Sequence, residues 1–526
     1  MDRSSTFRRH AVASPHHLAS AAGAAVLRDG GNAVDAAVAT NLVLSTVTPY
    51  FCGVGGDLLA IVHDGSAHGL MSAGRAPRGA TPAAIQASVD AAPQPPASLP
   101  GTDGMPSFGA LAVTVPGATA GWFDLLRRWG TRSFGDLAQA AINLAENGFV
   151  VSEKAGGFAD RARATIGVQP GWQRVYGSMA TGETFRQPDL AATLRTLSEQ
   201  GPDALYGGAI GEAVVAALQA GGSSMTLQDL ASHRVEDVGT ISGRFRDVEV
   251  LELPPPTQGV TALTALGVLD ALGDPASDPQ VFLHRQIEAV RAAMADRASY
   301  LGDPSHMAAT PTALLDRERL RAIAAGIDDD RAAAWPPVQP LPGGTAYLCA
   351  VDSDGLMVSL IQSNFQGFGS GIVPDGTGIP LNDRGAHFRL AAGHPSSIGP
   401  GRRPLHTLIP ALALRDGAPW LVFGTMGGDG QPQTQLQVLS QMLDAGRDVA
   451  TALDAPRFVV DVADGSVGLE SRFGPEVDAA LRGRGHVVRS LEAYEDIAGH
   501  AHAIQVTPQG LISASDPRSE GGVAGE

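Results

Sequence analysis

The chain has 526 residues, of which 44% are hydrophobic and 17% are charged, a composition typical of a globular protein with a large core. Its formal net charge of −17 disfavours nucleic acid and anionic membrane surfaces as partners, because both carry negative charge. The N-terminal stretch has charged residues but no apolar segment of a secretory signal, so the cytoplasm is the expected location.

The beginning of the chain predicts two helices. Residues 18–28 have helical spacing, and Asn32 is a suitable N-cap for a second helix from Ala33 to about Val47. The second segment contains Asp35 and Asn41, which indicates a buried helix and not a membrane span.

Strands and helices alternate through the next part of the chain. Residues 51–65 predict a glycine turn feeding a strand, and residues 109–130 predict a strand, a turn and a helix. Helical patterns dominate from about 135 to 235, the period changes to strands around 243–253, and a long helix is expected at roughly 280–300.

A polar, proline-rich tract from about 326 to 344 is the best linker in the chain. After it come short apolar runs joined by tight turns, with helices expected at 434–446 and 475–485. The two cysteines, Cys52 and Cys349, stand in apolar contexts without metal-ligand spacing, which predicts buried thiols and no disulfide framework.

The end of the linker has two interpretations. Thr345 follows Gly343 and Gly344 directly and begins an apolar run. Loops often end in glycine and strands often start with β-branched residues, so this can be an ordinary loop-to-strand junction. Alternatively, the Gly344–Thr345 bond is cut and leaves Thr345 as a new N-terminus. The local pattern leaves both open.

Familiar catalytic and cofactor motifs are missing from the sequence. It holds no G-x-S-x-G, Walker A or H-E-x-x-H motif, and "CGVGGD" is too short for a dinucleotide fingerprint. His500 and His502 would share one side of a strand, but without a third ligand nearby the wall of a wet pocket is favoured over a metal site. Neither a cofactor nor a metal is expected.

Glycines and arginines suggest a catalytic cleft. A predicted strand ends at Gly427-Gly428, before a helix from about Gln433. Paired glycines there can point backbone N–H groups into a cleft as an oxyanion hole, or can form an ordinary turn. Arg75, Arg384 and the pair at 402–403 lie in glycine-rich turns, where they are either solvated or bind a carboxylate.

Many stretches match one family in order. They include "GGNAVDAAVATNLVLSTVTP", "CGVGGD", "VPGATAGW", "TLQDLASH", "PPPTQG", "GTAYLCAVDSDG", "RRPLHTLIP", "GTMGGDG" and "ASDPRSEGG". The chain resembles the gamma-glutamyltransferase (gamma-glutamyltranspeptidase) family of N-terminal nucleophile hydrolases from about residue 15 to its end. The resemblance implies an α+β fold, a four-layer αββα sandwich. It also implies a zymogen cut into a large region (1–344) and a small region (345–526) that stay together as a heterodimer. Whether two heterodimers pair is left open.

The resemblance also implies catalytic roles. Thr345 matches the threonine that attacks its own preceding peptide bond and then serves as nucleophile. A freed α-amino group has a pKa near 8 and lies on the same residue, so it is a suitable base. Ser363 falls where the family has a hydroxyl touching the nucleophile. Gly427 and Gly428 fall on the oxyanion-hole glycines.

Substrate recognition is where the chain departs from the family. The family's ligands for the glutamyl α-amino group correspond to Phe365, Arg384 and His387. Its two carboxylate-binding serines correspond to His406 and Thr407. Its arginine position falls on Ala73, with Arg75 displaced by two residues.

Arg384 and His387, as two potential cations, should repel an ammonium group and attract a carboxylate. The chain is similar here to a branch with oxamate amidohydrolase and acylase-like members. The leading hypothesis is therefore an autoprocessing amidohydrolase acting on a small amide with a carboxylate-bearing acyl group, such as oxamate or a dicarboxylic monoamide. One alternative is a true gamma-glutamyl hydrolase or transferase acting on glutathione or related compounds. The other is an unprocessed, non-catalytic binding protein.

Overall fold

Two antiparallel sheets of seven strands each form the centre of the molecule. The computed structural model describes residues 3–92, 97–273, 278–335 and 343–526. The first sheet has the order β1 (Ser4–Phe7), β18 (Gly510–Ser515), β17 (Ala501–Thr507), β13 (Ala418–Thr425), β12 (Ala411–Arg415), β9 (Val248–Glu252) and β8 (Ile241–Phe245). The second has the order β19 (Gly522–Gly525), β2 (Ala11–Ser14), β10 (Gly344–Val351), β11 (Met357–Phe365), β3 (Asp57–His63), β4 (Ala67–Ser72) and β7 (Glu236–Asp237).

The strands alternate their side chains between two hydrophobic layers. In β10, Tyr347 and Cys349 join the core between the sheets, whereas Ala346 and Leu348 face the helices. This period of two is what a sheet covered on both faces requires. Because each sheet is packed on both sides, the architecture is the expected four-layer αββα sandwich of the N-terminal nucleophile hydrolases.

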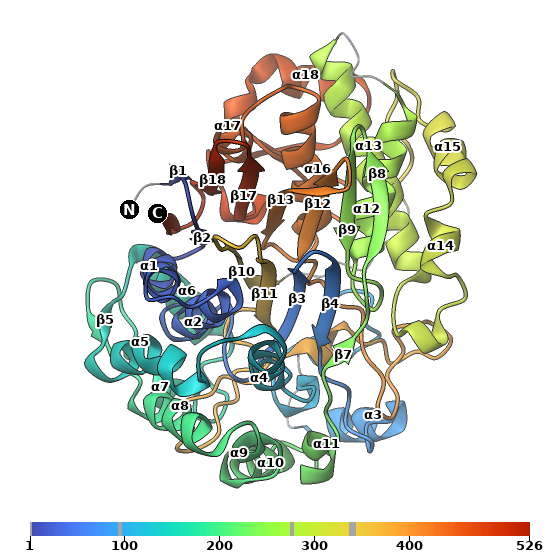
Figure 1. Ribbon diagram of the computed structural model, residues 1–526. Helices are drawn as coiled ribbons and strands as arrows, with labels where there is room; N and C mark the ends of the chain where they lie inside the picture. The colour runs from blue at the N-terminus through green and yellow to red at the C-terminus, as the bar shows by residue number, and fades with distance from the viewer. Residues whose placement is uncertain (1–2, 93–96, 274–277, 336–342) are drawn as a thin grey trace.

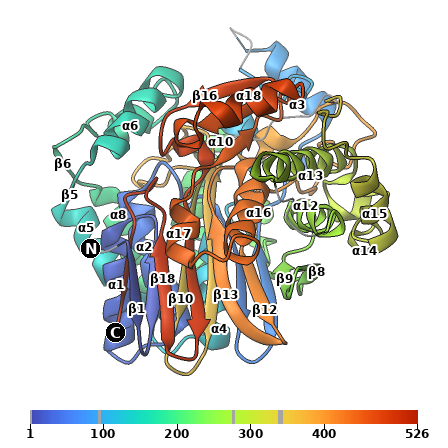
Figure 2. The same ribbon diagram turned by 90° about the horizontal axis from the view of Figure 1, so that it is seen from above.

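Helices cover the outer face of each sheet, and Figures 1 and 2 show the two groups on opposite sides of the strands. The second sheet is covered mainly by α1 (His17–Arg28), α2 (Ala33–Val47), α4 (Ala118–Trp129), α5 (Phe134–Asn147), α6 (Glu153–Thr165) and α8 (Pro188–Gln200). The first is covered by α12 (Gly259–Ala271), α13 (Pro279–Tyr300), α15 (Arg317–Ala325), α16 (Gly430–Leu443), α17 (Val449–Asp454) and α18 (Pro475–Gly483).

The remaining elements are short. The helices are α3 (Pro82–Asp90), α7 (Trp172–Tyr176), α9 (Asp203–Tyr206), α10 (Ala209–Ala220), α11 (Leu227–Ala231) and α14 (Pro311–Leu314). The 3-10 turns are η1 (Ala110–Ala112), η2 (Pro304–His306), η3 (Arg384–His387), η4 (Ser471–Phe473) and η5 (Asp496–Ala498). Two small sheets contain β5 (Phe149–Val150) with β6 (Thr184–Phe185), and β14 (Phe458–Val460), β15 (Val467–Glu470) and β16 (Val488–Leu491).

Several local predictions are confirmed. The Asn32 side chain accepts hydrogen bonds from the first turn of α2, while Asp35 bonds back to the Asn32 backbone, so both ends of a capping box are present. Cys52 and Cys349 are buried free thiols. The predicted linker lies partly outside the described residues, at 336–342. None of the described helices is long and apolar enough to cross a membrane.

One predicted strand is wrong. The apolar run at 109–115 forms the 3-10 turn η1, followed by extended backbone without a ladder partner. Thr114 instead donates to a side chain: the Asn382 side-chain oxygen accepts hydrogen bonds from both the backbone N–H and the hydroxyl of Thr114. A neighbouring loop therefore replaces the strand partner that the pattern predicted.

Candidate active site

The Gly344–Thr345 bond lies at an irregularity in the ladder between β10 and β11. Gly344 is opposite Phe365 and Ala346 is opposite Gln362, so the register shifts at Thr345. Such bulges re-aim a side chain and often occur beside functional sites. Thr345 is fully buried, and its hydroxyl has no hydrogen-bond partner among the described residues. A buried hydroxyl without a hydrogen-bond partner is uncommon in folded proteins, and this one lies on the residue that follows the bond expected to be cut.

Ser363 directs its only hydroxyl proton at the carbonyl of this bond. The Ser363 Oγ donates to the Gly344 carbonyl oxygen at 2.6 Å and accepts from the Phe365 backbone N–H at 2.7 Å. Since a carbonyl oxygen can only accept a hydrogen bond, the Ser363 hydroxyl must supply the proton in its contact with Gly344. Phe365 has a φ of 83°, a left-handed conformation that is strained for a bulky residue. In the uncut chain, Ser363 therefore polarises the Gly344 carbonyl.

Gly427 and Gly428 form the turn between β13 and α16. Their φ angles are 122° and 55°, values that favour glycine. A Cβ atom placed on Gly343 would lie 3.5 Å from the Gly428 Cα atom, so the turn adjoins the peptide that precedes the bond. Helix α16 begins at Gly430, three residues before the predicted start, and its N-terminal end adds partial positive charge near the turn.

Gln258 links this turn to Thr407, which lies in the segment before β12. Its side-chain amide donates to the carbonyls of Gly428 at 2.8 Å and Thr407 at 2.9 Å. Its side-chain oxygen accepts from Arg297 at 2.8 Å, and Arg297 also pairs with Asp429. Gln258 is fully buried, so this network fixes how the Gly428 peptide is oriented. Reasoning from the sequence did not single out Gln258, although it lies in the "PPPTQG" stretch.

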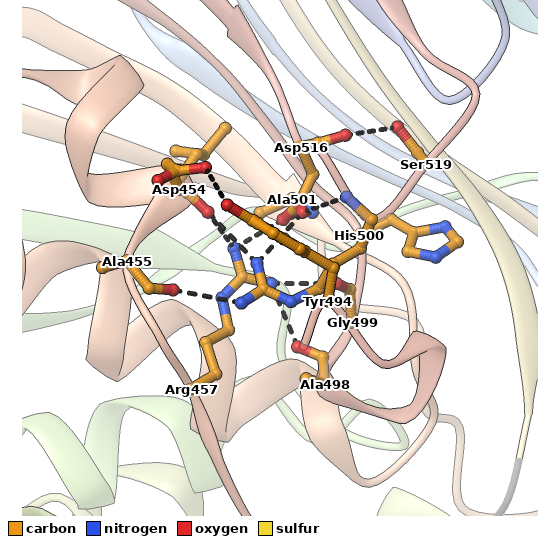
Figure 3. Close-up of polar contacts among 12 residues, drawn as sticks. Asp454, Ala455, Arg457, Tyr494, Ala498, Gly499, His500, Ala501, Asp516 and Ser519 are labelled. Carbon is orange, nitrogen blue, oxygen red and sulfur yellow. Dashed lines mark hydrogen bonds and ion pairs between the residues drawn. The ribbon is translucent and has the colours of Figure 1, made fainter. Parts of the chain in front are cut away.

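A buried arginine supports the turn from behind. The Arg457 guanidinium donates to the carbonyls of Ala498 and Gly499 at 3.0 and 2.9 Å and pairs with the Asp516 carboxylate at 2.5 Å (Figure 3). A Cβ atom placed on Gly427 would lie 3.5 Å from the Gly499 Cα atom. The loop that Arg457 holds therefore packs directly against the glycine turn.

Arg384, His387, Thr407 and Phe365 form a buried cluster, here called the cradle, and Phe365 lies opposite Gly344 in the ladder. The Phe365 ring lies 3.8 Å from the His387 ring and 4.7 Å from the Arg384 guanidinium carbon. Arg384 donates to the Thr407 hydroxyl at 3.1 Å, but its Nε and Nη2 atoms have no hydrogen-bond partner among the described residues. Arg384 is fully buried. Burial lowers the pKa of Arg384 to about 10, which leaves it charged at neutral pH.

Asp57 supplies a counter-charge that the sequence interpretation did not include. Its Oδ2 atom lies 3.8 Å from Arg384 Nε and 3.0 Å from His406 Nε2, and its Oδ1 atom accepts from the Gly74 N–H at 2.9 Å. Burial alone would raise the pKa of Asp57, but His406, Arg384 and Gly74 outweigh it and hold the pKa below its usual value. The cradle therefore contains a carboxylate beside its arginine.

The prediction of two cations in the cradle is wrong for His387. Burial, followed by the nearby Arg384 charge, lowers the pKa of His387 well below its usual value, so the ring is neutral at pH 7. His387 Nδ1 lies 2.8 Å from the Leu405 carbonyl and must donate to it, which leaves Nε2 as an unpaired acceptor. Burial also lowers the pKa of His406 to about 4. Arg384 is thus the cation of this group.

Arg75 does not reach the cradle. Its half-exposed side chain donates to Glu236 at 3.0 Å and to the Gly401 carbonyl at 3.1 Å. Arg403 also binds Glu236 with both terminal nitrogens and donates to the Ala73 carbonyl. The structure places these arginines in a surface ion-pair cluster, separate from the Arg384 cradle.

Two histidine groups bear on metal binding. His500 and His502 are buried, so neither lines an open wet pocket as predicted, and His500 lies 3.0 Å from the Asp496 carboxylate. His284, Glu288 and His486 bring three ligand atoms within 4.8 Å of one another. There, however, the Arg291 guanidinium lies 3.5 Å from His486 Nδ1 and 3.3 Å from Glu288. A cation inside this group disfavours a bound metal ion.

Comparisons with known proteins agree with this geometry. The family profile for Gamma-glutamyltranspeptidase matches residues 19–526. The chain is 36% identical to the oxamate amidohydrolase proenzyme of Klebsiella pneumoniae subsp. pneumoniae, with 99% of each chain covered. It is 33% identical to the glutathione hydrolase-like YwrD proenzyme of Bacillus subtilis, with 100% of each covered. The crystal structure of cephalosporin acylase from Bacillus halodurans superposes with a TM-score of 0.92 at 33% identity, covering 100% of this chain and 97% of that one. The chain therefore belongs to the gamma-glutamyltranspeptidase family and is an amidohydrolase-type enzyme with the fold of the N-terminal nucleophile hydrolases.

Proposed function

We propose that the chain cuts its own Gly344–Thr345 bond and then hydrolyses small amides whose acyl half carries a carboxylate, with Thr345 as the nucleophile. The observation that carries the choice of substrate is Arg384: a fully buried guanidinium with two nitrogens lacking hydrogen-bond partners among the described residues. Such a group is costly unless an anion meets it during function. The relative that acts on oxamate supports the same substrate class.

The first reaction uses groups already in place. Thr345 Oγ1 attacks the Gly344 carbonyl carbon, and Ser363, at 2.6 Å from the carbonyl oxygen, stabilises the developing negative charge. The C–N bond breaks as the hydroxyl proton passes to the Thr345 nitrogen, and an ester to Thr345 Oγ1 replaces the peptide bond. Water then hydrolyses the ester, which frees both the hydroxyl and the α-amino group. The products are a region 1–344 and a region 345–526 that remain associated.

The second reaction uses the freed α-amino group of Thr345. That amine accepts the hydroxyl proton as Thr345 attacks the substrate carbonyl, and the proton passes to the leaving amine as the C–N bond breaks. Water then hydrolyses the acyl ester on Thr345, which releases the carboxylic acid and restores the hydroxyl. Backbone N–H groups of the Gly427-Gly428 turn stabilise the oxyanion. The substrate carboxylate binds Arg384 in the cradle, which orients the amide carbonyl toward Thr345.

A denaturing gel combined with a substrate comparison tests the proposal. The 54.0 kDa chain should give bands of about 35 and 19 kDa, because 344 of its 526 residues precede the bond. Thr345→Ala should leave one band, while Thr345→Ser, which keeps a hydroxyl, should still be cut. Wild type should hydrolyse oxamate or glutaric monoamide at least tenfold more efficiently than a γ-glutamyl amide. Cleavage of Thr345→Ala at the same bond would show that the nucleophile is misassigned.

A second variant tests the oxyanion turn. Gly428→Val places a branched side chain where the backbone has a φ of 55°, and should lower turnover by about 10²–10³ while the protein remains folded. Near-normal turnover would locate the oxyanion hole elsewhere.

Asp57 is the observation that favours a second function. A buried carboxylate beside the cradle is a suitable partner for the ammonium group of a γ-glutamyl substrate. If wild type prefers the γ-glutamyl amide and Arg384→Gln harms both substrates equally, the enzyme is a gamma-glutamyl hydrolase or transferase. A single uncut band for wild type would instead indicate a non-catalytic binding protein.

A further inference from the structure

An open cavity of about 750 Å³ adjoins the Gly344–Thr345 bond on the side away from the cradle. It begins at Gly343, Gly344 and Gly427 and is large enough for a drug-sized molecule. Most of its other lining is apolar: Phe51, Leu99, Pro100, Phe158, Met426, Val459, Val460, Val462 and Ile497.

Most polar side chains on the lining already have protein partners, including Asp461, which lies 3.5 Å from Arg489. The exposed Arg161 instead places its guanidinium carbon 4.4 Å from the centre of the Phe158 ring. Asp496 pairs with Lys154 and lies 3.0 Å from His500. Asp429 pairs with Arg297, and the Gln366 amide donates to Asp383 at 2.8 Å. Since these groups are engaged, the surface left for a ligand is mainly hydrocarbon, and the side chain of Ile497 remains 57% exposed beside it.

Phe365 separates this cavity from the cradle. On one side its ring contacts His387 and Arg384. On the other, a Cβ atom placed on Gly343 would lie 3.4 Å from the ring, and Leu99 of the cavity packs against the same cluster. The cradle residues are buried, whereas the cavity is open to solvent. An amide that reaches Thr345 with its acyl end in the cradle must therefore extend its amine half into the cavity.

We propose that the preferred substrates are N-substituted amides whose leaving amine carries a bulky apolar group, such as an arylalkyl amine. This inference rests on the proposed function. It specifies the amine half of the substrate, whereas Arg384 specifies only the acyl half. A primary amide, which releases ammonia, would leave the apolar lining uncovered. The bond changes stay those of amide hydrolysis: the acyl carbon bonds to Thr345 Oγ1, the C–N bond breaks, and the amine departs with the hydroxyl proton.

The test compares N-(2-phenylethyl) and N-(2-hydroxyethyl) monoamides of one dicarboxylic acid, oxalic or glutaric, because their leaving amines have similar basicity. With the purified processed enzyme, we expect kcat/KM to be about ten- to a hundredfold higher for the phenylethyl amide. Ile497→Asp places a charge on the lining and should reduce this ratio at least fivefold. Val487→Asp is the matched control: Val487 is 63% exposed and outside the lining, so the ratio should stay at the wild-type value.

The outcomes separate the two proposals. Equal efficiency for the two amides, in an enzyme that hydrolyses both, overturns the apolar-amine preference and leaves the proposed function standing. A high ratio that Ile497→Asp does not change overturns the placement of the amine in this cavity. An uncut chain that hydrolyses neither amide overturns both proposals.

Discussion

Two groups of buried arginines in this molecule differ in how completely they are paired. Arg518 binds both oxygens of Glu470 at 2.8 and 2.6 Å and also reaches Asp516. Arg457 pairs with Asp516 and donates to three backbone carbonyls, two of which Figure 3 shows. Arg384 is as deeply buried, yet within the described part of the chain its side chain makes one hydrogen bond, and its Nε atom lies 3.8 Å from the Asp57 carboxylate.

The difference indicates different purposes. A buried charge contributes to a fixed structure only when its hydrogen bonds are made within the protein. Arg457 and Arg518 satisfy that condition and fasten the end of the chain to the loop behind the glycine turn. Arg384 does not satisfy that condition, and it lies close to the candidate nucleophile. This is what we expect of a residue whose hydrogen bonds are completed by a substrate.

The largest expected effect comes from replacing Arg384, the incompletely paired arginine. Arg384→Met should lower kcat/KM for a carboxylate-bearing amide by about 10²–10³, because each charged hydrogen bond contributes on the order of 1.5–3 kcal/mol. The free energy of unfolding should not fall by more than about 1 kcal/mol, since an unsatisfied charge is removed. Steady-state kinetics and urea unfolding measure the two effects. A large loss of stability with a small loss of activity would make Arg384 a structural residue.

Replacing the fully paired Arg457 should instead reduce stability more than activity. Arg457→Met removes one of the two arginines that pair with the buried Asp516 and the side-chain donor to the Gly499 carbonyl, and should destabilise the fold by about 3–5 kcal/mol. Thermal unfolding of the intact processed protein measures this. An Arg457→Met protein as stable as wild type would contradict the structural role that its full pairing suggests.

A smaller effect should follow from removing the charge beside Arg384. Asp57→Asn keeps groups that can bond His406 and Gly74 but no longer offsets the guanidinium, so a dicarboxylate inhibitor should bind about three- to tenfold more tightly. Hydrolysis of a γ-glutamyl amide should weaken. Asp383→Asn is a matched control, because burial raises the pKa of Asp383 well above its usual value, whereas the pKa of Asp57 is held below its usual value. Weaker dicarboxylate binding by Asp57→Asn would show that Asp57 orients Arg384 more than it opposes the anion.

The smallest expected effect is a pH dependence of anion binding. The pKa of His387 lies well below its usual value in the free cradle, and a bound carboxylate would raise it. Affinity for glutarate should therefore increase a few-fold as the pH falls from 8 toward 5, since protonated His387 favours the anion. Arg384, Arg297, His406 and the Phe365 ring surround His387, and His406 has a pKa of about 4. Inhibition constants for wild type and His387→Gln test this. An equal slope in both would assign the titration to another group.

Much of the fold could be predicted from the sequence because its signals are local. The helix cap at Asn32 and the glycine turn at 427–428 each depend on residues that are adjacent in the sequence. The family resemblance supplied the layers, which no local pattern contains. The apolar run at 109–115 was misassigned because its partner is a side chain 268 residues away, Asn382.

The candidate site was less predictable, because charge states depend on neighbours that are distant in the chain. His387 is neutral because it is buried beside Arg384, whereas its residue type alone suggested a cation. Asp57 lies 349 residues from His406, its hydrogen-bonding partner. Both Asp57 and Gln258 stand within stretches that matched the family, so a search of those stretches for buried polar side chains could have found them.

The order of strands determines what happens to a cut chain when it unfolds. Strand β2 lies between β10 and β19, and β3 pairs with β11, so segments from before and after residue 344 are interleaved within one sheet. Hydrogen bonds of the ladder would keep the two pieces together without a covalent link. Once denatured, however, the two pieces would have to associate in solution before β2 could insert between its neighbouring strands. Refolding would then be bimolecular, whereas the folding of the uncut chain is unimolecular. The stability of the cut enzyme would thus be kinetic: the rate of unfolding, and not a reversible folding equilibrium, would set how long it stays active.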